Sequence, residues 1–517
     1  MSAPLTHIES TAEIPHSADV VVIGGGIVGS FTAYYLARRG VKVALLEKGR
    51  IGAEQSSRNW GWCRQQNRDA RELPMATMSL DLWERFAAEA GEDVGFRRCG
   101  LLYLSNDEQE LATWSRWCEF ARTVGVTTSM LGRAEANQRG RATGRDWRGG
   151  VFSPTDGTAD PSRAAPAVAR AVMKLGGSVH QQCAARGLEM QAGRVAGVVT
   201  EHGVIRTPAV VLAAGAWASS FCRQLDIHFP QATVRQSSLA LAAGPEILPD
   251  ALHTKAVSVT RRADGSYTLA ISGRGRLDPT PQLLRFSTRF LPMFAKRWRS
   301  VTPGGLEGLR SGHESRQRWA LDRPTPMERM RILDPAPDRA TVRLTHERAV
   351  ALLPALGNRA VTATWAGYID TTPDGVPRTM NSDGHFNDMH AMMAFVATGR
   401  DELQSRLVGA MKRAADGFGT NAMMTREVGL PAARGIRAFA RGTFDDAVEY
   451  LLPLRAKAQL FGGSHAQRDV ISWTLVEAAV RAGDKSMAMA LAAERLAVKP
   501  TSPLNLAWRD RAKAPSR

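Results

Sequence analysis

Residues 18–48 read ADVVVIGGGIVGSFTAYYLARRGVKVALLEK, and this stretch decides the fold. It begins with a short apolar run, Val20 to Ile23, which is typical of a strand buried on both faces. Gly24, Gly26 and Gly29 follow in the G-x-G-x-x-G spacing. In that spacing the glycines permit a tight turn, a close backbone approach to a pyrophosphate, and packing of helix on strand. The stretch therefore predicts a strand, a glycine turn and a helix that bind a dinucleotide.

The second half of the stretch supplies the other end of such a site. A helical pattern runs from Ile27 to Gly40, and a second strand closes on Glu47, which lies 23 residues after Gly24 (47 − 24). A carboxylate at about this distance accepts hydrogen bonds from an adenosine ribose. A glutamate here disfavours a 2′-phosphate, so FAD or NAD is expected rather than NADP.

Length and composition limit the remaining possibilities. With 517 residues, two or three domains are expected. The five cysteines form no C-x-x-C motif, which predicts no metal site and a reducing, cytoplasmic location. Residues 1–16 read as a polar leader rather than a signal peptide, and no apolar run is long enough for a membrane span. The net charge of +17 is scattered along the chain, so we expect a basic solvated surface and no nucleic-acid partner.

Three further motifs carry a family resemblance. They are GAEQSSRNWGWCRQQ at 52–66, VIRTPAVVLAAGAW at 204–217 and VTATWAGYIDTTPDGVPR at 361–378. With the glycine turn, they make residues 17–380 resemble the D-amino-acid-oxidase superfamily of FAD-dependent amine oxidoreductases. The motif at 52–66 is most similar to the branch of bacterial L-amino-acid oxidases and deaminases.

The resemblance implies FAD as cofactor and assigns residues to it. The implied FAD contacts are Gly24, Gly26, Ile27, Val28, Gly29, Glu47, Lys48, Ser56, Ser57, Arg58, Ala214, Gly215 and Trp217. The implied substrate contacts are Gln65, Gln66, Trp365 and Tyr368. No catalytic side chain is assigned, because the cofactor carries the chemistry. A substrate carboxylate would require an arginine, and the sequence does not choose among Arg285, Arg310 and Arg316.

The expected fold class is α/β followed by an all-α region. An FAD-binding Rossmann-like domain (17–90, 151–225 and 360–380) is interleaved with an antiparallel-sheet substrate domain (91–150 and 226–359). Asp264-Gly265 predicts a hairpin turn within that sheet. Near residue 381 the chain departs from the family, whose glycine-rich turn and last helix against the flavin are missing from this sequence. This departure puts tight FAD retention in question.

Residues 386–517 predict a helical domain built from hairpin repeats. Gly442 and Gly483 begin similar units 41 residues apart (483 − 442). GTFDDAVEYLLPLR, GGSHAQRDV and AAERLAVKPTSPLN resemble the C-terminal part of the tetratricopeptide-repeat-protein-38 family. His465 and Asp469, one turn apart on a helix, are expected to serve helix capping and packing rather than metal binding. The repeats offer a surface for a protein partner.

The sequence favours oxidation of the C–N bond of a small amine, above all an L-amino acid. Hydride transfer to flavin N5 would give an imine, and hydrolysis would then give a keto acid and ammonia. The electron acceptor is either oxygen or a quinone. One alternative is a D-amino-acid or N-methyl-amine (sarcosine-like) dehydrogenase. Another, of a different class, is a catalytically impaired flavoprotein–repeat fusion that acts as a binding scaffold.

Overall fold

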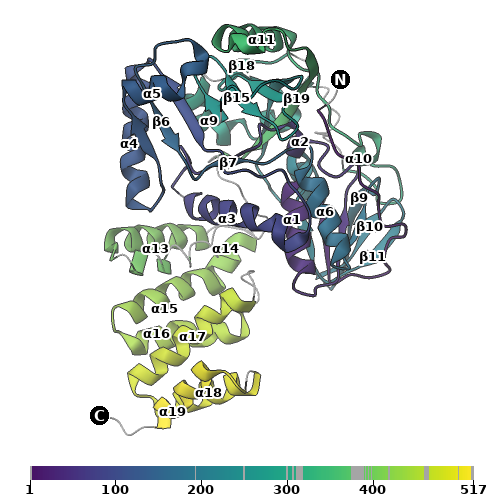
Figure 1. Cartoon of the computed structure of the whole chain (residues 1–517). Coiled ribbons are helices and arrows are strands. Elements are labelled where there is room, and N and C mark those ends of the chain that lie inside the picture. Colours follow the sequence, from purple (N-terminus) through teal and green to yellow (C-terminus); the bar gives the residue numbers. More distant parts are fainter. Residues whose placement is uncertain are drawn as a thin grey trace. The chain divides into compact units, whose positions relative to one another are not determined.

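The computed structural model divides the chain into two compact units, Met1–Arg378 and Thr379–Arg517. It describes residues 3–70, 72–192, 194–248, 251–298, 301–305, 308–309, 318–373, 389, 392–393, 395–397, 399–416, 420–458, 465–498 and 500–513. Among these residues, no helix is both long enough and apolar enough to cross a bilayer. Figure 1 shows the elements of each unit.

A four-stranded parallel sheet holds the glycine turn. Its strand order is β12 (Val210–Leu212), β1 (Val20–Ile23), β2 (Val43–Leu46) and β8 (Ser178–His180). Helices α1 (Ile27–Ala37) and α6 (Ala164–Lys174) pack side by side, and their apolar faces share one core with β2 (Figure 1). The predicted strand, glycine turn, helix and second strand are thus confirmed.

A second, larger sheet lies in the first unit. Its main path runs β18 (Val301–Pro303), β17 (Gly275–Leu277), β13 (Ala232–Leu241), β16 (Tyr267–Ala270), β15 (Ser258–Arg261), β14 (Ala251–His253), β4 (Leu101–Ser105), β6 (Gly149–Ser153) and β5 (Ser129–Leu131). The hairpin at Asp264-Gly265 joins β15 to β16, as predicted. The sheet is mixed rather than antiparallel, because β14 runs parallel to β4 and β17 parallel to β18. Strand β14 pairs with β4 from far earlier in the chain, and the local sequence of a strand does not determine whether such a pairing is parallel or antiparallel.

Strand β19 (Val361–Thr371) joins the large sheet through β13. The two strands pair antiparallel from Ala232↔Thr371 to Leu241↔Val361. The sequence analysis assigns residues 360–380 to the nucleotide-binding part, whereas β19 hydrogen-bonds to the large sheet. A separate three-stranded antiparallel sheet contains β11 (Gly203–Arg206), β10 (Arg194–Thr200) and β9 (Ala185–Gln191).

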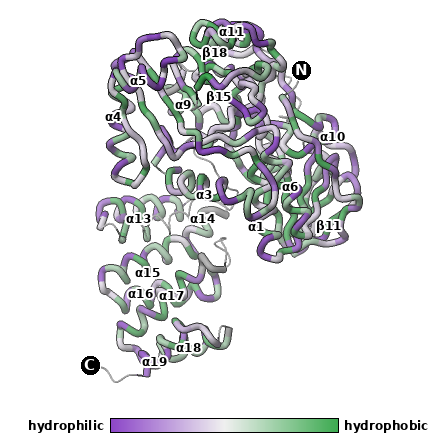
Figure 2. The backbone as a smooth tube through the Cα atoms, viewed as in Figure 1, coloured by the Kyte–Doolittle hydropathy of each residue, from purple (hydrophilic) through white to green (hydrophobic). Residues whose placement is uncertain are grey.

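The second unit is helical. Its described helices include α13 (Asp401–Ala415), α15 (Leu430–Ala440), α16 (Phe444–Leu451), α17 (His465–Ala482), α18 (Lys485–Val498) and α19 (Pro503–Lys513). Gly442 and Gly483 each adopt φ +79° between successive helices. Apolar residues alternate with polar ones along these helices, as helices that bury one face require (Figure 2). Asp469 forms an ion pair with Arg495 of α18, which is the inter-helix contact expected of it. The repeat arrangement and the family of this unit stay predictions.

Candidate functional site

The glycine turn is shaped by close backbone packing. Gly24 adopts φ +110°, and a Cβ atom there would lie 2.3 Å from the carbonyl oxygen of Ala213. A Cβ atom on Gly29 would lie 1.9 Å from the carbonyl oxygen of Gly24. Distances this short exclude any side chain, so strand β1, helix α1 and the segment after β12 can meet only through glycine.

Gly26 stands at the N-cap of α1, where a helix attracts anions. Its side-chain position is open except for the Ser56 hydroxyl oxygen, 3.1 Å from where a Cβ atom would lie. The amide of Ile27 donates to that same hydroxyl at 2.9 Å, and the Val28 side chain beyond it is 62% exposed. Exposed helix N-terminal amides beside a small hydroxyl residue fit a pyrophosphate group.

Glu47 lies beside the turn, at the carboxyl end of β2. Its carboxylate accepts the amide of Gly25 at 2.8 Å and the amide of Gly49 at 2.7 Å. Burial raises its pKa, and the charge of Lys48 and the two amides oppose that rise. The position is the one at which a ribose-binding carboxylate is needed, so the residues of this turn fit the adenosine half of FAD.

The second set of predicted FAD residues packs internally. Lys48 Nζ lies 2.5 Å from Glu54 Oε1 and 4.4 Å from the centre of the Trp217 ring. The Trp217 ring nitrogen donates to both carboxylate oxygens of Glu54 at 3.2 Å. Trp217 is buried, so these side chains buttress the turn from behind. Ala214 borders the turn directly, because its Cα would lie 3.1 Å from a Cβ on Gly24, and Gly215 begins the short helix that carries Trp217.

Helix α2 (Gln55–Arg58) connects the turn to β19. Arg58 is buried, and its guanidinium donates to the carbonyl of Ala366 at 2.8 Å and pairs with Asp334 at 2.8 Å. The indole nitrogen of Trp365 donates to the carbonyl of Arg58 at 3.1 Å. Ser57 is buried too, and its hydroxyl lies 3.3 Å from the carbonyl of Glu54. Arg58 and Trp365 therefore hold helix α2 against strand β19 of the large sheet.

The two predicted glutamines are buried side by side in hydrogen bonds. Both backbone amides donate to Asp156, at 2.8 Å from Gln65 and 3.1 Å from Gln66. The Gln65 side chain donates to Thr77 at 2.7 Å. The side-chain nitrogen of Gln66 is buried and has no hydrogen-bond partner among the described residues. An unpaired buried donor of this kind is suited to a bound group.

Trp365 and Tyr368 are not brought together. They stand three residues apart on β19, and side chains at odd spacing point to opposite faces of a strand. Trp365 packs with Ala240 and Ala363, whereas the Tyr368 hydroxyl donates to Asp278 at 3.2 Å. The two side chains therefore cannot line the same wall of a substrate pocket, as the sequence analysis expects of them.

The sequence analysis missed Arg64, which in the sequence follows Arg58 and directly precedes the two glutamines. Its guanidinium donates to the carbonyl of Gln66 and forms no ion pair with any described residue. Of the arginines named from sequence, Arg285 is exposed on α8 (Pro281–Arg285), while Arg310 and Arg316 fall outside the described residues. Its place in the sequence could have identified it, because Arg64 lies within the motif at 52–66 that also contains the predicted FAD residues Ser56, Ser57 and Arg58.

A cluster of aromatic rings lies near this arginine, whose charge acts against burial to lower the pKa of Tyr103 and adds to burial in lowering that of His253. Trp62 contacts Trp60 edge-on at 5.1 Å between ring centres, and its ring nitrogen donates to Thr260 at 2.7 Å. The rings of Tyr103 and His253 lie 4.6 Å apart, because β4 and β14 pair Tyr103 directly with His253. We call Trp60, Trp62, Tyr103 and His253 the aromatic cluster. Arg64 beside such a cluster suits an anionic ligand with an apolar part.

Burial determines the charge states of His253 in the aromatic cluster and of Asp156 beside the two glutamines. Burial lowers the pKa of His253 to about 4, and the charge of Arg64 adds to the effect, so the imidazole is neutral at pH 7. Burial raises the pKa of Asp156 to about 6 against the amides of Gln65 and Gln66 and the charges of Arg64 and Arg68. Near neutral pH Arg64 therefore faces a neutral histidine, and Asp156 is ionised.

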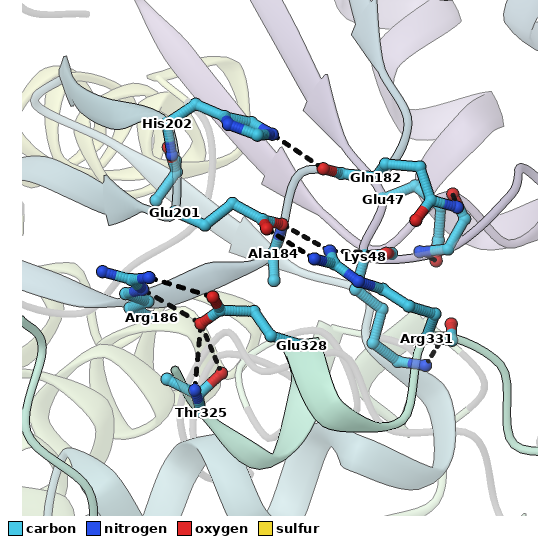
Figure 3. A network of polar contacts seen from close by, with 12 residues as sticks. Glu47, Lys48, Gln182, Ala184, Arg186, Glu201, His202, Thr325, Glu328 and Arg331 are labelled. Atoms are coloured by element: carbon cyan, nitrogen blue, oxygen red, sulfur yellow. Dashed lines mark hydrogen bonds and ion pairs between the residues drawn. The ribbon is translucent and has the colours of Figure 1, made fainter. Parts of the chain in front are cut away.

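A network of polar contacts locks a later segment onto the Glu47 loop (Figure 3). Arg331 makes a two-pronged ion pair with Glu201 and donates to the carbonyl of Lys48 at 3.1 Å. Lys48 Nζ donates in return to the carbonyl of Arg331 at 2.9 Å. Arg186 pairs with Glu328 at 2.9 Å on the same segment (Figure 3). The network fixes the loop that follows Glu47.

An open hollow of about 650 Å³ lies elsewhere, lined by Ser17, Asp19, Lys42 and Arg206. Ser17, Asp19 and Lys42 stand where strands β1 and β2 begin, and Arg206 ends β11. Ligands of parallel sheets bind at the carboxyl ends of the strands, which is where the glycine turn stands. The described residues contain no group of three or more His, Cys, Asp and Glu side chains placed to hold a metal ion.

Comparisons with known proteins agree with this geometry. The family model described as FAD dependent oxidoreductase matches residues 19–400. The L-amino acid deaminase structure from Proteus vulgaris is 30% identical, covers 72% of this chain and 88% of its own, and has a TM-score of 0.68. Glycine oxidase of Geobacillus kaustophilus is 24% identical over 371 residues, 70% of this chain and 84% of its own.

Mitochondrial sarcosine dehydrogenase of Mus musculus is 32% identical over 225 residues, which are 42% of this chain. The chain spans only 24% of the length of that relative. The family match covers well over half of the chain and contains the glycine turn, Glu47 and the aromatic cluster. FAD is therefore the cofactor that the family match implies, and the chain belongs to the family of FAD-dependent oxidoreductases.

Proposed function

We propose that this protein is an FAD-dependent oxidoreductase that oxidises the C–N bond of a small amine carrying a carboxylate, most favourably an L-amino acid. The observation that carries the proposal is Arg64, which has no ion-pair partner among the described residues and stands beside the aromatic cluster. Its fork geometry matches both oxygens of a carboxylate. The likeness to an L-amino acid deaminase supports the L-configuration.

The roles of the side chains follow from their contacts. When FAD is bound, its flavin can accept a hydride from the carbon that bears the amine. Arg64 holds the substrate carboxylate, while Trp62 and Tyr103 exclude water from the apolar part. The neutral His253 adds no second positive charge beside Arg64. Asp156 fixes the backbone of Gln65 and Gln66. The side-chain nitrogen of Gln66, which has no partner among the described residues, is a further donor toward a bound group.

The first test is spectroscopic. The purified protein loaded with FAD should lose its oxidised-flavin absorption when an L-amino acid is added without air. Paired enantiomers separate the proposal from its rival, a D-amino-acid or N-methyl-amine dehydrogenase, which the likeness to sarcosine dehydrogenase supports. Bleaching by D-amino acids or sarcosine alone would assign the rival activity.

The second test is aimed at Arg64. Replacing it by methionine should weaken amino-acid binding roughly a hundredfold. The rate with an amine that lacks a carboxylate should be unchanged. Arg285→Met, at the exposed arginine named from sequence, is the matched control and should bind amino acids normally. Equal losses for both kinds of substrate would show that Arg64 has only a structural role.

A proposal of another class is a binding scaffold whose flavoprotein part is inert. The helical second unit supports it, because stacked helical hairpins present extended faces to peptides. A protein that stays colourless after incubation with FAD would favour the scaffold over the enzyme. The five cysteines form no disulfide with one another in the described part of the chain, which supports a reducing, cytoplasmic location.

A further inference from the structure

Arg262 carries a buried positive charge at the end of β15. It is only 5% exposed and forms no ion pair with any described residue. Its amide donates to the carbonyl of Ser266 at 2.7 Å, and its side-chain Nε donates to the Thr268 hydroxyl at 2.9 Å. Its buried Nη2 has no hydrogen-bond partner among the described residues. Because burying an unpaired charge is costly, this guanidinium is suited to a bound anion.

The acidic residue of the same hairpin is engaged in the turn. The Asp264 carboxylate accepts the amide of Ser266 at 2.9 Å and its hydroxyl at 2.6 Å. Although burial raises the pKa of Asp264, these two bonds and, to a lesser degree, the charge of Arg262 lower it. Asp264 therefore closes the turn between β15 and β16, and it does not form the ion pair that Arg262 lacks in the described part of the chain.

Arg262 lies on the face of the large sheet that carries the aromatic cluster. Directly paired strand residues share a face, and alternate residues of one strand return to it. His253 pairs with Ser258, and Thr260 and Arg262 follow Ser258 at alternate positions. The contacts agree, because His253 Nδ1 lies 2.9 Å from the Ser258 hydroxyl and the Trp62 ring nitrogen donates to Thr260. The arginine and the cluster therefore share one face.

Small side chains continue this face toward Trp365. Ser238 of β13 pairs with Ala270 on one side and with Trp365 on the other, and Ala240 follows at the next alternate position. The three small residues are buried, and the guanidinium carbon of Arg262 lies 5.9 Å from the centre of the Trp365 ring. Small residues between an arginine and an indole suit the close approach of a narrow ligand.

The two unpaired arginines are separated along this face. Burial and the charge of Arg64 both lower the pKa of His253, which places Arg64 at the cluster. Ser258, the partner of His253, stands four residues before Arg262 (262 − 258), which corresponds to about 13 Å along a strand. One carboxylate fills one planar fork. Two separated forks therefore match a ligand with two carboxylates joined by a short stem.

We propose that Arg262 forms a second anion subsite, which makes a dicarboxylic amino acid such as L-glutamate the preferred substrate. Arg64 holds the α-carboxylate, and Arg262 holds the side-chain carboxylate through its free Nη2. Trp62 and Trp365 border the methylene stem. This inference rests on the proposed function, because it assigns the α-carboxylate to Arg64.

The test uses the full chain loaded with FAD and two ligands that carry no amine to oxidise. Glutarate has two carboxylates, and butyrate has one. Glutarate should perturb the flavin absorption at a concentration about tenfold lower than butyrate. Arg262→Met should weaken glutarate binding about tenfold to a hundredfold and leave butyrate binding unchanged. With substrates, the same variant should raise KM for L-glutamate but not for L-glutamine.

Arg261→Met is the matched control. Arg261 is the neighbouring residue on β15, its side chain lies on the opposite face, and it stands 4.0 Å from Glu246. This variant should bind both ligands like the wild type. Arg262→Met should keep the Tm of the apoprotein, because no ion pair is lost. Arg262→Lys keeps the charge without the fork and should bind glutarate with intermediate affinity.

The proposal is overturned if the wild type binds glutarate no more tightly than butyrate, or if Arg262→Met keeps the wild-type ratio of the two affinities. A changed flavin reduction potential with that ratio unchanged would assign Arg262 to the cofactor instead. A large loss of Tm with equal loss of both ligands would assign it to the fold. Failure of the proposed function has a different signature, in which no amino acid bleaches the flavin although glutarate binding still depends on Arg262.

Discussion

Lys48 and Arg331 hold each other through their main chains. Lys48 Nζ donates to the carbonyl of Arg331 at 2.9 Å, and the Arg331 guanidinium donates to the carbonyl of Lys48 at 3.1 Å. The next residue, Gly49, leaves no room for a side chain, since a Cβ atom there would lie 2.2 Å from the carbonyl oxygen of Arg331. Because Glu47 accepts the Gly49 amide, this exchange fixes the carboxylate that we propose for the ribose.

Arg331→Met should therefore weaken FAD binding about tenfold, because the loop after Glu47 loses its lock. Flavin fluorescence titration of the apoprotein measures the dissociation constant. Arg343→Met is the control, since Arg343 is 79% exposed and belongs only to a surface pair. Unchanged FAD affinity in Arg331→Met would show that Glu47 is held without this lock.

Gly26→Ala should reduce FAD affinity by about tenfold or more, because a methyl group at the N-cap of α1 occupies the space that a pyrophosphate requires. The apoprotein should lose little of its Tm, since Gly26 has φ −72° and the added methyl meets only the Ser56 hydroxyl oxygen at 3.1 Å, which must shift by a few tenths of an ångström. Gly132→Ala is the matched control, because Gly132 is also an extended N-cap glycine with nothing within 4 Å. A large loss of Tm in Gly26→Ala would mean that its effect is steric rather than on the cofactor.

Asp156 and His253 should give the stability of the first unit opposing pH dependences. Burial raises the pKa of Asp156 from 3.8 to about 6, so its contribution is complete below the lower value and is lost as the pH rises toward the upper one. Burial lowers the pKa of His253 from 6.5 to about 4, so its contribution is complete above the upper value and is lost as the pH falls toward the lower one. Each shift corresponds to about 3 kcal/mol.

Asp156→Asn should consequently make the free energy of unfolding rise more steeply with pH between about pH 4 and pH 6. His253→Asn should make it fall over the same interval. Urea denaturation at a series of pH values measures both slopes. Two variants with the wild-type slope would contradict the assigned pKa values.

Glu477→Gln should destabilise the second unit at neutral pH. Although burial raises the pKa of Glu477, hydrogen bonds from Arg511, Arg481 and Trp508 lower it from 4.5 to about 2. The stabilisation is present above the upper value and is lost as the pH falls toward the lower one. We expect a loss of about 1 to 2 kcal/mol after allowing for solvent screening.

Hydrogen exchange of peptides from α17 and α19 reports this loss locally. Glu494→Gln is the control, because Glu494 pairs with Arg455 at 2.7 Å but is 55% exposed. Such surface pairs contribute little, so that variant should exchange like the wild type. Equal protection in both variants would show that the Glu477 cluster does not stabilise the helices.

The glycine turn could be predicted from sequence because its determinants are local. Gly24 and Gly29 are required by contacts within one strand–turn–helix unit, and Glu47 ends the next strand. The aromatic cluster could not be predicted in this way. Tyr103 meets His253 only because β4 and β14 pair in parallel across 150 residues (253 − 103), and no local pattern encodes that pairing.

Trp365 and Tyr368 illustrate a second limit of the sequence. The family motif identifies both, but it does not state that the segment is an extended strand throughout. Once β19 pairs along β13, a spacing of three sends the two side chains to opposite faces. Arg64 illustrates a third, since a surface arginine and a ligand-binding arginine look alike until their partners are known.

The bond between Trp365 and the carbonyl of Arg58 joins residues 307 positions apart. A chain leaving the ribosome exposes its glycine turn early, yet helix α2 acquires this support only after β19 has emerged. Nascent chains that stop short of residue 366 should therefore form the first strand and helix but release flavin readily. Loading with FAD thus becomes a late event in biosynthesis, coupled to completion of the large sheet.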